Sequence, residues 1–186
     1  MNIKNRKFKK ANLFTSIIFI IVAVFYLINE NISTTKDKTT DSLVSVLSIA
    51  DGDTLTARIG KKEEKIRLIG IDAPELAQKP WGEKSKEFLQ SIISSSGWKV
   101  SIEYDIDKRD KYGRLLAYLR TADGQLINQK MLENGYAMLF TFPPNVKYVN
   151  ELTAAQSTAR KNKLGIWSDK GLKERPVDYR MVHPRK

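Results

Sequence analysis

The sequence of 186 residues contains no cysteine and only one histidine, His183, close to its C-terminal end. The absence of cysteine excludes disulfide scaffolds, cysteine-ligated zinc, iron–sulfur clusters and thiol nucleophiles. A single histidine argues against a Ser-His-Asp triad, an HExxH zinc site and histidine-based acid–base catalysis. Any catalysis by this chain therefore depends on carboxylates, arginines, lysines, tyrosines and a hard metal ion.

The chain also has fewer acidic than basic residues. It carries 32 Lys and Arg against 21 Asp and Glu, which gives a formal net charge of +11. A basic excess attracts polyanions through long-range fields, and nucleic acid is the most common such partner. Charge alone does not distinguish a nucleic-acid-binding protein from a soluble basic domain.

Long apolar runs are missing except at the N-terminus. Residues 1–12 form a flank with five basic side chains, and residues 13–28 form an uncharged segment. We expect residues 13–28 to be an uncleaved signal-anchor helix, with a cleaved signal peptide as the alternative. The basic flank predicts a cytoplasmic N-terminus, an extracellular remainder and a cell-membrane location, or secretion if the segment is cleaved. Residues 29–42, rich in Thr, Ser and Lys, are expected to form a flexible tether.

The rest of the chain is long enough for one domain, which we place at residues 43–168. Alternation of apolar and polar residues predicts five strands, at 43–49, 54–59, 65–71, 98–104 and 114–120. Residues 60–64 are expected to form a polar turn. Helical spacing predicts about three helices, at 80–96, 125–134 and 149–162. This mainly β pattern with late helices favours a small closed barrel of the OB-fold type. Residues 169–186 read as a charged tail with little order.

Three polar clusters lie at the predicted strand ends: DGDT at 51–54, Arg67 with DAPE at 72–75, and DKYGR at 110–114. Each is a weak signal alone, since DG suits a hairpin turn and proline suits a β-turn. If the strands bring Asp53 beside Asp72, however, the oxygen-only cluster favours Ca²⁺ or Mg²⁺. Two arginines, Arg67 and Arg114, would add forked donors that match the oxygens of a phosphate.

The order DGDT, RLIGIDAPE, DKYGRLLAY and GIWS resembles the thermonuclease, or staphylococcal-nuclease-like, family from about residue 44 to residue 168. The resemblance implies an OB-fold barrel with three helices and calcium-dependent cleavage of DNA and RNA that leaves 3′-phosphate ends. Nucleic acid, single-stranded or denatured, is then the expected partner, bound by a monomer without an obligate protein partner.

The same resemblance implies a role for each matching residue. Asp53, Asp72 and the backbone carbonyl of Ala73 match the family's calcium ligands. The catalytic residues are implied to be Arg67, Glu75 and Arg114. The positions around the metal and the nucleotide phosphate are Asp51, Thr54, Asp110, Lys111 and Tyr112.

This sequence departs from the family pattern in three places. Many family members have threonine where this chain has Ala73, a change that a main-chain ligand should tolerate. The segment from Glu75 to Trp81 is short, so we expect a trimmed loop beside the active site. After Gly135 the family often has tyrosines that stack on the nucleotide, whereas this stretch reads YAMLFTFPPN, in which Phe140 or Phe142 would substitute for them by stacking without a hydroxyl.

The main alternative is a catalytically inactive OB module that only binds nucleic acid. Such a module would have no need for Asp53, Asp72, Arg67, Glu75 and Arg114 together. All five are present, so the sequence favours the enzyme.

Overall fold

The computed structural model describes residues 43–184 of the chain. None of the helices in that range is long and apolar enough to cross a membrane. The expected basic flank at 1–12, membrane helix at 13–28 and tether at 29–42 lie outside the described residues, and so these assignments stay predictions.

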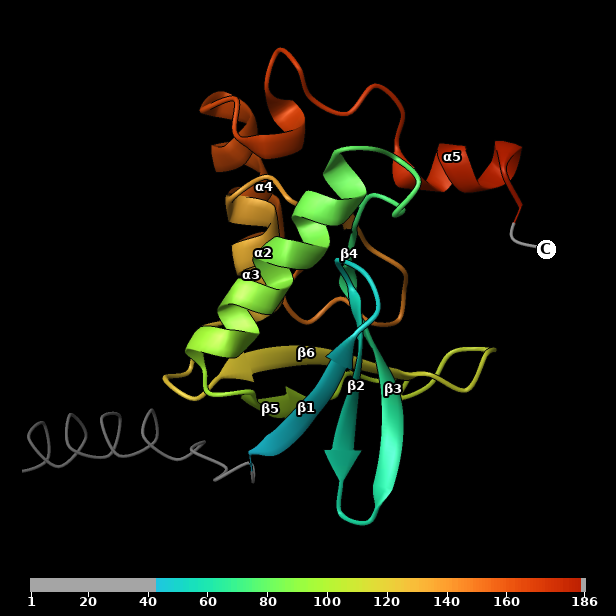
Figure 1. Cartoon of the computed structure of the whole chain (residues 1–186), viewed down its shortest axis with the longest axis vertical. Coiled ribbons are helices and arrows are strands. Elements are labelled where there is room, and N and C mark those ends of the chain that lie inside the picture. The colour runs from blue at the N-terminus through green and yellow to red at the C-terminus, as the bar shows by residue number, and fades with distance from the viewer. Residues whose placement is uncertain (1–42, 185–186) are drawn as a thin grey trace, which may run out of the picture. The chain divides into compact units, whose positions relative to one another are not determined.

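Five strands close into a barrel in the order β1-β2-β3-β6-β5 (Figure 1). Their bounds are Val44–Ile49 for β1, Thr54–Ile59 for β2, Lys62–Leu68 for β3, Lys99–Glu103 for β5 and Leu115–Thr121 for β6. Four of the five seams are antiparallel, while β3 and β6 pair in parallel. The predicted five-stranded barrel is therefore confirmed.

The third strand differs from the prediction at both ends. Lys62 and Glu64 were expected in a turn, but they pair with Ile59 and Ala57 on β2. Residues 62–65 are thus strand, and their successive side chains are exposed or half-buried because both faces of this end of the hairpin meet solvent. At its other end the strand breaks at Ile69, and Gly70 has a φ of +79°, a left-handed conformation that glycine adopts without strain.

Beyond this break the chain turns into β4, Gly70–Asp72, which pairs with β7, Met138–Phe140, in a small second sheet. The break redirects the backbone, so that Asp72 and the residues after it leave the barrel wall. It therefore sets the position of the DAPE segment relative to the barrel.

Three helices match the predicted ones within a few residues: α2 at Trp81–Ser95, α3 at Ile127–Glu133 and α4 at Val149–Lys161. They pack on the barrel through apolar side chains such as Leu89, Met131 and Leu152, all essentially inaccessible to solvent. A 3-10 turn, η1, spans Gly165–Trp167.

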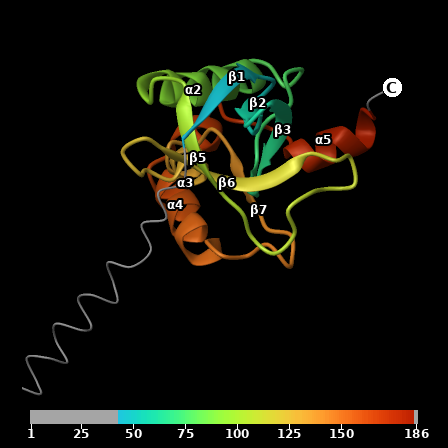
Figure 2. The ribbon, with the colours of Figure 1, turned by 90° about the horizontal axis from the view of Figure 1, so that it is seen from below.

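The C-terminal segment was expected to have little order, and that expectation is wrong for residues 176–182. Here the structure has a fourth helix, α5, at Pro176–Val182. It begins with proline at its first turn, where the missing N–H costs no hydrogen bond. Both Figure 1 and Figure 2 show α5 standing apart from the other three helices.

Candidate active site

The turn between β1 and β2 and the ends of β3 and β4 form one polar cluster. Thr54 pairs with Arg67 across the hairpin, and the Leu68 N–H donates to the Asp53 carbonyl over 2.8 Å. Gly52 fits because the backbone passes very close to its neighbours: a Cβ there would meet the Ala73 Cβ at 2.7 Å and collide with the Ser85 hydroxyl. The turn is thereby held against the segment that follows β4.

Arg67 joins the two aspartates that the sequence predicted as metal ligands. Its Nη1 lies 3.1 Å from Asp53 Oδ2, and its Nη2 lies 3.2 Å from Asp72 Oδ1. Nη1 also donates to the Leu68 carbonyl over 2.7 Å. The fork of a guanidinium can satisfy several acceptors at once, which a lysine ammonium does not do in this geometry.

Asp53 is held in place from three sides. Its Oδ1 accepts from the Thr54 hydroxyl over 3.0 Å, and its Oδ2 accepts from the Ala73 N–H over 2.7 Å. Its own N–H donates to Asp51 Oδ1. The Thr54 hydroxyl and the Ala73 N–H therefore orient the carboxylate, while Asp51 holds the backbone of Asp53.

The environment of Asp53 is short of positive charge. Burial raises the pKa of Asp53 to about 7, because loss of hydration outweighs the attraction of Arg67, and Asp51 adds repulsion. Asp53 and Asp72 are only 6% and 2% exposed. The ion pair that the structure gives Asp53 is with Arg67, and a further cation beside Asp53 would stabilise its charged form.

The donor set fits a hard divalent cation, namely carboxylate oxygens of Asp53 and Asp72 and the adjacent carbonyl of Ala73. Within residues 43–184, no group of three or more acidic or histidine side chains is arranged to hold a metal. A cation at this cluster would thus rely on two carboxylates, a main-chain oxygen and water or substrate oxygens.

Glu75 lies on the loop after β4 and faces the same cluster. Its N–H donates to the side-chain oxygen of Gln78 over 3.0 Å, which fixes the short turn before α2. Its carboxylate meets the cluster through Arg180, whose Nη1 lies 3.0 Å from both Glu75 Oε1 and Asp72 Oδ1. The short turn before α2 thus leaves Glu75 and Asp72 in contact with the same guanidinium.

Arg114 is placed near these residues but is bound elsewhere. The parallel register pairs Arg67 with Leu116, two residues beyond Arg114. The Arg114 Nε lies 2.6 Å from Asp110 Oδ2, and Asp110 Oδ1 accepts from the N–H groups of Tyr112 and Arg114. Burial opposes ionisation of Asp110, but the bonds from Arg114 outweigh it and lower the pKa of this acid.

Lys111 and Tyr112 form the exposed tip of the loop that carries Arg114. The Lys111 ammonium lies 5.1 Å and the Arg114 guanidinium 5.6 Å from the centre of the Tyr112 ring, which is 73% exposed as a residue. An exposed aromatic ring between two cations is a suitable surface for a nucleotide. The structure therefore puts these residues on an accessible loop, while the carboxylates lie inside.

Arg180 was missed by sequence reasoning, which placed it among solvated tail residues. It makes three hydrogen bonds in the cluster, two to Asp72 and one to Glu75, each of 3.0 Å. Its separation from Asp72 by 108 positions leaves no local pattern that would reveal the contact.

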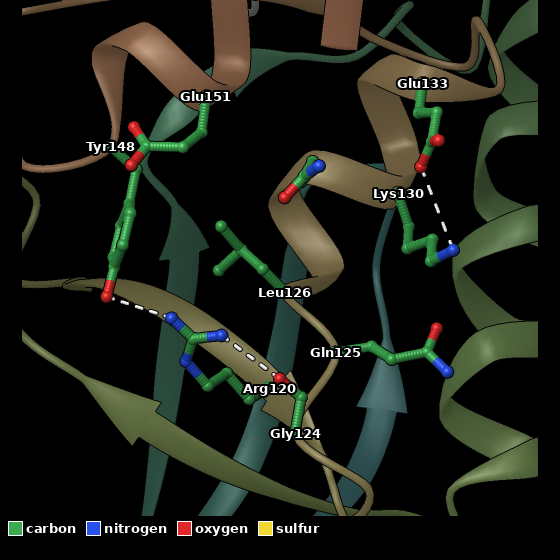
Figure 3. Close-up of a pocket in the computed structure, with 9 residues that line it drawn as sticks. Arg120, Gly124, Gln125, Leu126, Lys130, Glu133, Tyr148 and Glu151 are labelled. Atoms are coloured by element: carbon green, nitrogen blue, oxygen red, sulfur yellow. Dashed lines mark hydrogen bonds and ion pairs between the residues drawn. The ribbon is translucent and has the colours of Figure 1, made fainter. Parts of the chain in front are cut away.

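A separate hollow of about 490 Å³ lies between α3, α4 and β6 (Figure 3). At its edge Arg120 bonds to Tyr148, whose hydroxyl lies 2.7 Å from Glu103, and Lys147 lies 2.6 Å from Glu103. Burial opposes ionisation of Glu103, but hydrogen bonds from Lys147 and Tyr148 outweigh it and lower its pKa. This network shares no residue with the cluster around Arg67.

The lowered pKa of Glu103 predicts how the stability of the fold depends on pH. A carboxyl whose pKa is lower in the folded state stabilises the fold above its unfolded pKa of about 4.3, and this contribution is lost as pH falls through the folded value. When the pH falls from 6 to 3, the free energy of unfolding should therefore decrease less in Glu103→Gln than in the wild type. The difference between the two proteins should be less than about 1 kcal/mol, because the site is partly solvated. Urea unfolding at several pH values measures this difference.

Glu133→Gln is the control for loss of a negative charge, because Glu133 lies at the same hollow, 3.8 Å from Lys130. Parallel curves of unfolding free energy against pH for Glu103→Gln and the wild type would contradict the prediction.

Sequence comparison with known proteins identifies the family of this chain. Residues 65–169 match the family described as Staphylococcal nuclease homologue. The chain is 34% identical over 157 residues to a thermonuclease of Staphylococcus intermedius, covering 81% of this chain and 92% of that protein. It is 33% identical to a thermonuclease of Staphylococcus hyicus, covering 67% and 75%. With the endonuclease YncB of Bacillus subtilis it shares 34% identity, covering 65% and 59%. The resemblance inferred from the motifs is confirmed, and the chain belongs to the staphylococcal nuclease family.

Proposed function

We propose that this protein is a calcium-dependent endonuclease that hydrolyses phosphodiester bonds of DNA and RNA and leaves 3′-phosphate ends. The observation that carries the proposal is the cluster in which Arg67 bridges Asp53 and Asp72 beside Glu75. The thermonuclease relatives support it, since their name describes the same class of enzyme.

The calcium ligands would be Asp53, Asp72 and the carbonyl of Ala73. When bound there, Ca²⁺ would neutralise charge on the scissile phosphate and polarise it toward attack by water. The role of Thr54 and the Ala73 N–H is to hold the Asp53 carboxylate in one orientation, which they do through bonds of 3.0 and 2.7 Å. Preorganised ligands of this kind cost no rearrangement when the cation enters.

Arginine and carboxylate side chains would perform the rest of the reaction. Arg67 would bind the equatorial phosphate oxygens, where negative charge increases in the transition state. Arg114, released from Asp110, would bind a second oxygen or the leaving group. Glu75 would orient the attacking water and accept its proton, with positioning contributing more than basicity because an ordinary carboxylate is a weak base at neutral pH.

Substrate binding would extend over the exposed loop that carries Lys111 and Tyr112. The lysine would contact a neighbouring phosphate, while the tyrosine ring would stack on a base or donate its hydroxyl to phosphate. Stacking on an exposed ring requires an unpaired base, so single-stranded or denatured nucleic acid is the substrate we expect to be cleaved best.

We also propose that the enzyme acts outside the cytoplasm, as a monomer attached to the membrane through residues 13–28. Five basic residues before the apolar segment support this orientation. Detection of the protein in washed membranes would support an uncleaved anchor, and detection in culture fluid would support cleavage.

Cleavage itself is tested with the full-length protein and denatured DNA, in Ca²⁺ or in a chelator. We expect fragmentation in Ca²⁺ and at least about a 100-fold lower rate in chelator, because the metal-free cluster cannot neutralise the phosphate. The fragments should accept labelled phosphate from polynucleotide kinase without phosphatase treatment, since their 5′ ends carry hydroxyl groups.

An Asp72→Asn variant is the control for a contaminating nuclease and should behave like the chelated wild type. Retention of DNA without fragmentation in Ca²⁺ would instead identify a binding module and would refute the proposal.

A further inference from the structure

The C-terminal segment docks beside the active-site loop before it reaches α5. The Trp81 indole N–H donates to the Lys170 carbonyl over 3.3 Å, and the Gln78 amide donates to the Glu174 carbonyl over 2.9 Å. The same Gln78 side chain accepts the Glu75 N–H through its oxygen. Docking of the segment is therefore linked, through one glutamine, to the loop that carries Glu75.

From this docking point α5 directs Arg180 onto the acidic cluster. Nη1 donates to Asp72 Oδ1 and Glu75 Oε1, and Nη2 donates to Asp72 Oδ2, each over 3.0 Å. Burial opposes the charge of Arg180, but the bonds to Asp72 and Glu75 outweigh it and raise the pKa of the guanidinium. Arg180 thus supplies the additional positive charge that the cluster requires.

These bonds engage the same oxygens that a metal ion would need. Asp72 Oδ1 accepts from both Arg67 and Arg180, and Asp72 Oδ2 accepts from Arg180. A divalent cation competes for these lone pairs and repels the guanidinium at close range. Ligation through Asp72 Oδ1 therefore requires one of the two arginines to move, and ligation through Oδ2 places the cation next to the Arg180 guanidinium.

Arg180 is the arginine that can move at lower cost. Arg67 lies within β3, has a side chain only 15% exposed, and is also bound to the Leu68 carbonyl. The Arg180 side chain is 33% exposed and belongs to a seven-residue helix whose only buried residue is Pro176. Helices shorter than about 12–15 residues are marginal without packing, so α5 is an element of low local stability.

We propose that Arg180 is an internal cation that holds α5 over Asp72 and Glu75 in the metal-free protein, and that a divalent cation at Asp53 and Asp72 displaces it and releases the helix. This inference rests on the proposed calcium site. It makes the C-terminal segment an autoinhibitory strap, because the cation that activates the enzyme also frees Glu75 from Arg180.

Calcium binding to the full-length protein, measured by titration calorimetry without substrate, is the first test. Arg180→Gln should bind Ca²⁺ about tenfold more tightly than the wild type, the factor expected if roughly nine-tenths of the wild-type molecules hold the strap closed. Lys173→Gln removes the same charge from an exposed position in the same segment and should bind with wild-type affinity.

Hydrogen exchange of the wild-type protein separates displacement from a simple charge effect. The amides of Tyr179 and His183 donate to the carbonyls of Arg175 and Tyr179 within α5, so their exchange reports on the helix. Saturating Ca²⁺ should accelerate their exchange at least about fivefold, since release removes tertiary support from a short helix.

The two tests distinguish this inference from the function on which it rests. Equal calcium affinity in Arg180→Gln and wild type, with unchanged exchange in α5, overturns the strap and leaves the calcium site standing. Absence of calcium binding in both proteins overturns the calcium site and the strap together.

Discussion

Replacing Arg67 by lysine is expected to lower kcat/KM on denatured DNA by about 10²–10³, although the positive charge is retained. Removal of one preorganised donor to a developing oxyanion costs about 3–4 kcal/mol of transition-state stabilisation. A lysine ammonium is a point charge that cannot reproduce the contacts of Arg67 to Asp53, Asp72 and the Leu68 carbonyl together. The variant should therefore lose both the phosphate fork and the bridge between the two aspartates.

The measurement is initial-rate kinetics at saturating Ca²⁺, with thermal unfolding to show that the variant is folded. Arg58→Lys is the matched control, because Arg58 makes an exposed ion pair with Glu63 on the same β2–β3 hairpin. That control should keep its activity within about twofold, since exposed ion pairs contribute little. Near wild-type turnover by Arg67→Lys would remove Arg67 from the catalytic roles proposed above.

The pairing of the strands that carry Asp53 and Arg67 was predictable, because the two strands are neighbours in the sequence. The turn at residues 60–61 pairs Thr54 on β2 with Arg67 on β3, which puts Asp53 at the strand end that also carries Arg67. The register was not predictable from alternation, since residues 60–64 read as a polar turn. The break at Ile69 was not predictable, since residues 65–71 read as one continuous apolar strand. The turn of the chain there accompanies a long-range contact, the pairing of β4 with the distant β7.

The contact of Arg180 is the part of the site that sequence patterns could not provide. A seven-residue helix with one buried position has no apolar periodicity to detect, and a lone arginine among charged residues resembles a solvated tail. The contact depends instead on two unpredictable docking bonds, from Trp81 and Gln78 to backbone carbonyls of the tail. Electrostatic partners 105 and 108 positions apart are decided by the tertiary structure.

The DKYGR motif singles out Arg114 but does not show which group Arg114 binds. Within the DKYGR loop, Asp110 accepts bonds from Arg114 and Tyr112 that close the loop on itself. Local bonds of this kind form whenever the loop folds, whether or not a substrate is present. In the proposed reaction Asp110 would be the resting partner that keeps the guanidinium oriented, and a phosphate would have to compete with it.

Asn128, which no sequence pattern singled out, joins α3 to the barrel at the point where β3 ends. Its Oδ1 accepts from the Leu119 N–H over 3.0 Å, and its Nδ2 donates to the Ile69 carbonyl over 2.8 Å. The residue is inaccessible to solvent. The amide thus satisfies backbone groups at the strand break, where no regular sheet partner follows.

Asn128→Ala is expected to lower the free energy of unfolding by about 3 kcal/mol, because a buried donor and a buried acceptor each lose this partner at about 1–3 kcal/mol. For a domain of this size that corresponds to a fall in Tm of about 10 °C. Urea unfolding and calorimetry measure both quantities. Asn162→Ala, at the exposed end of α4, should change stability by less than about 0.5 kcal/mol. If both variants unfolded like the wild type, water would be able to replace the Asn128 amide, and the strand break that positions Asp72 would have to be held by β4–β7 pairing instead.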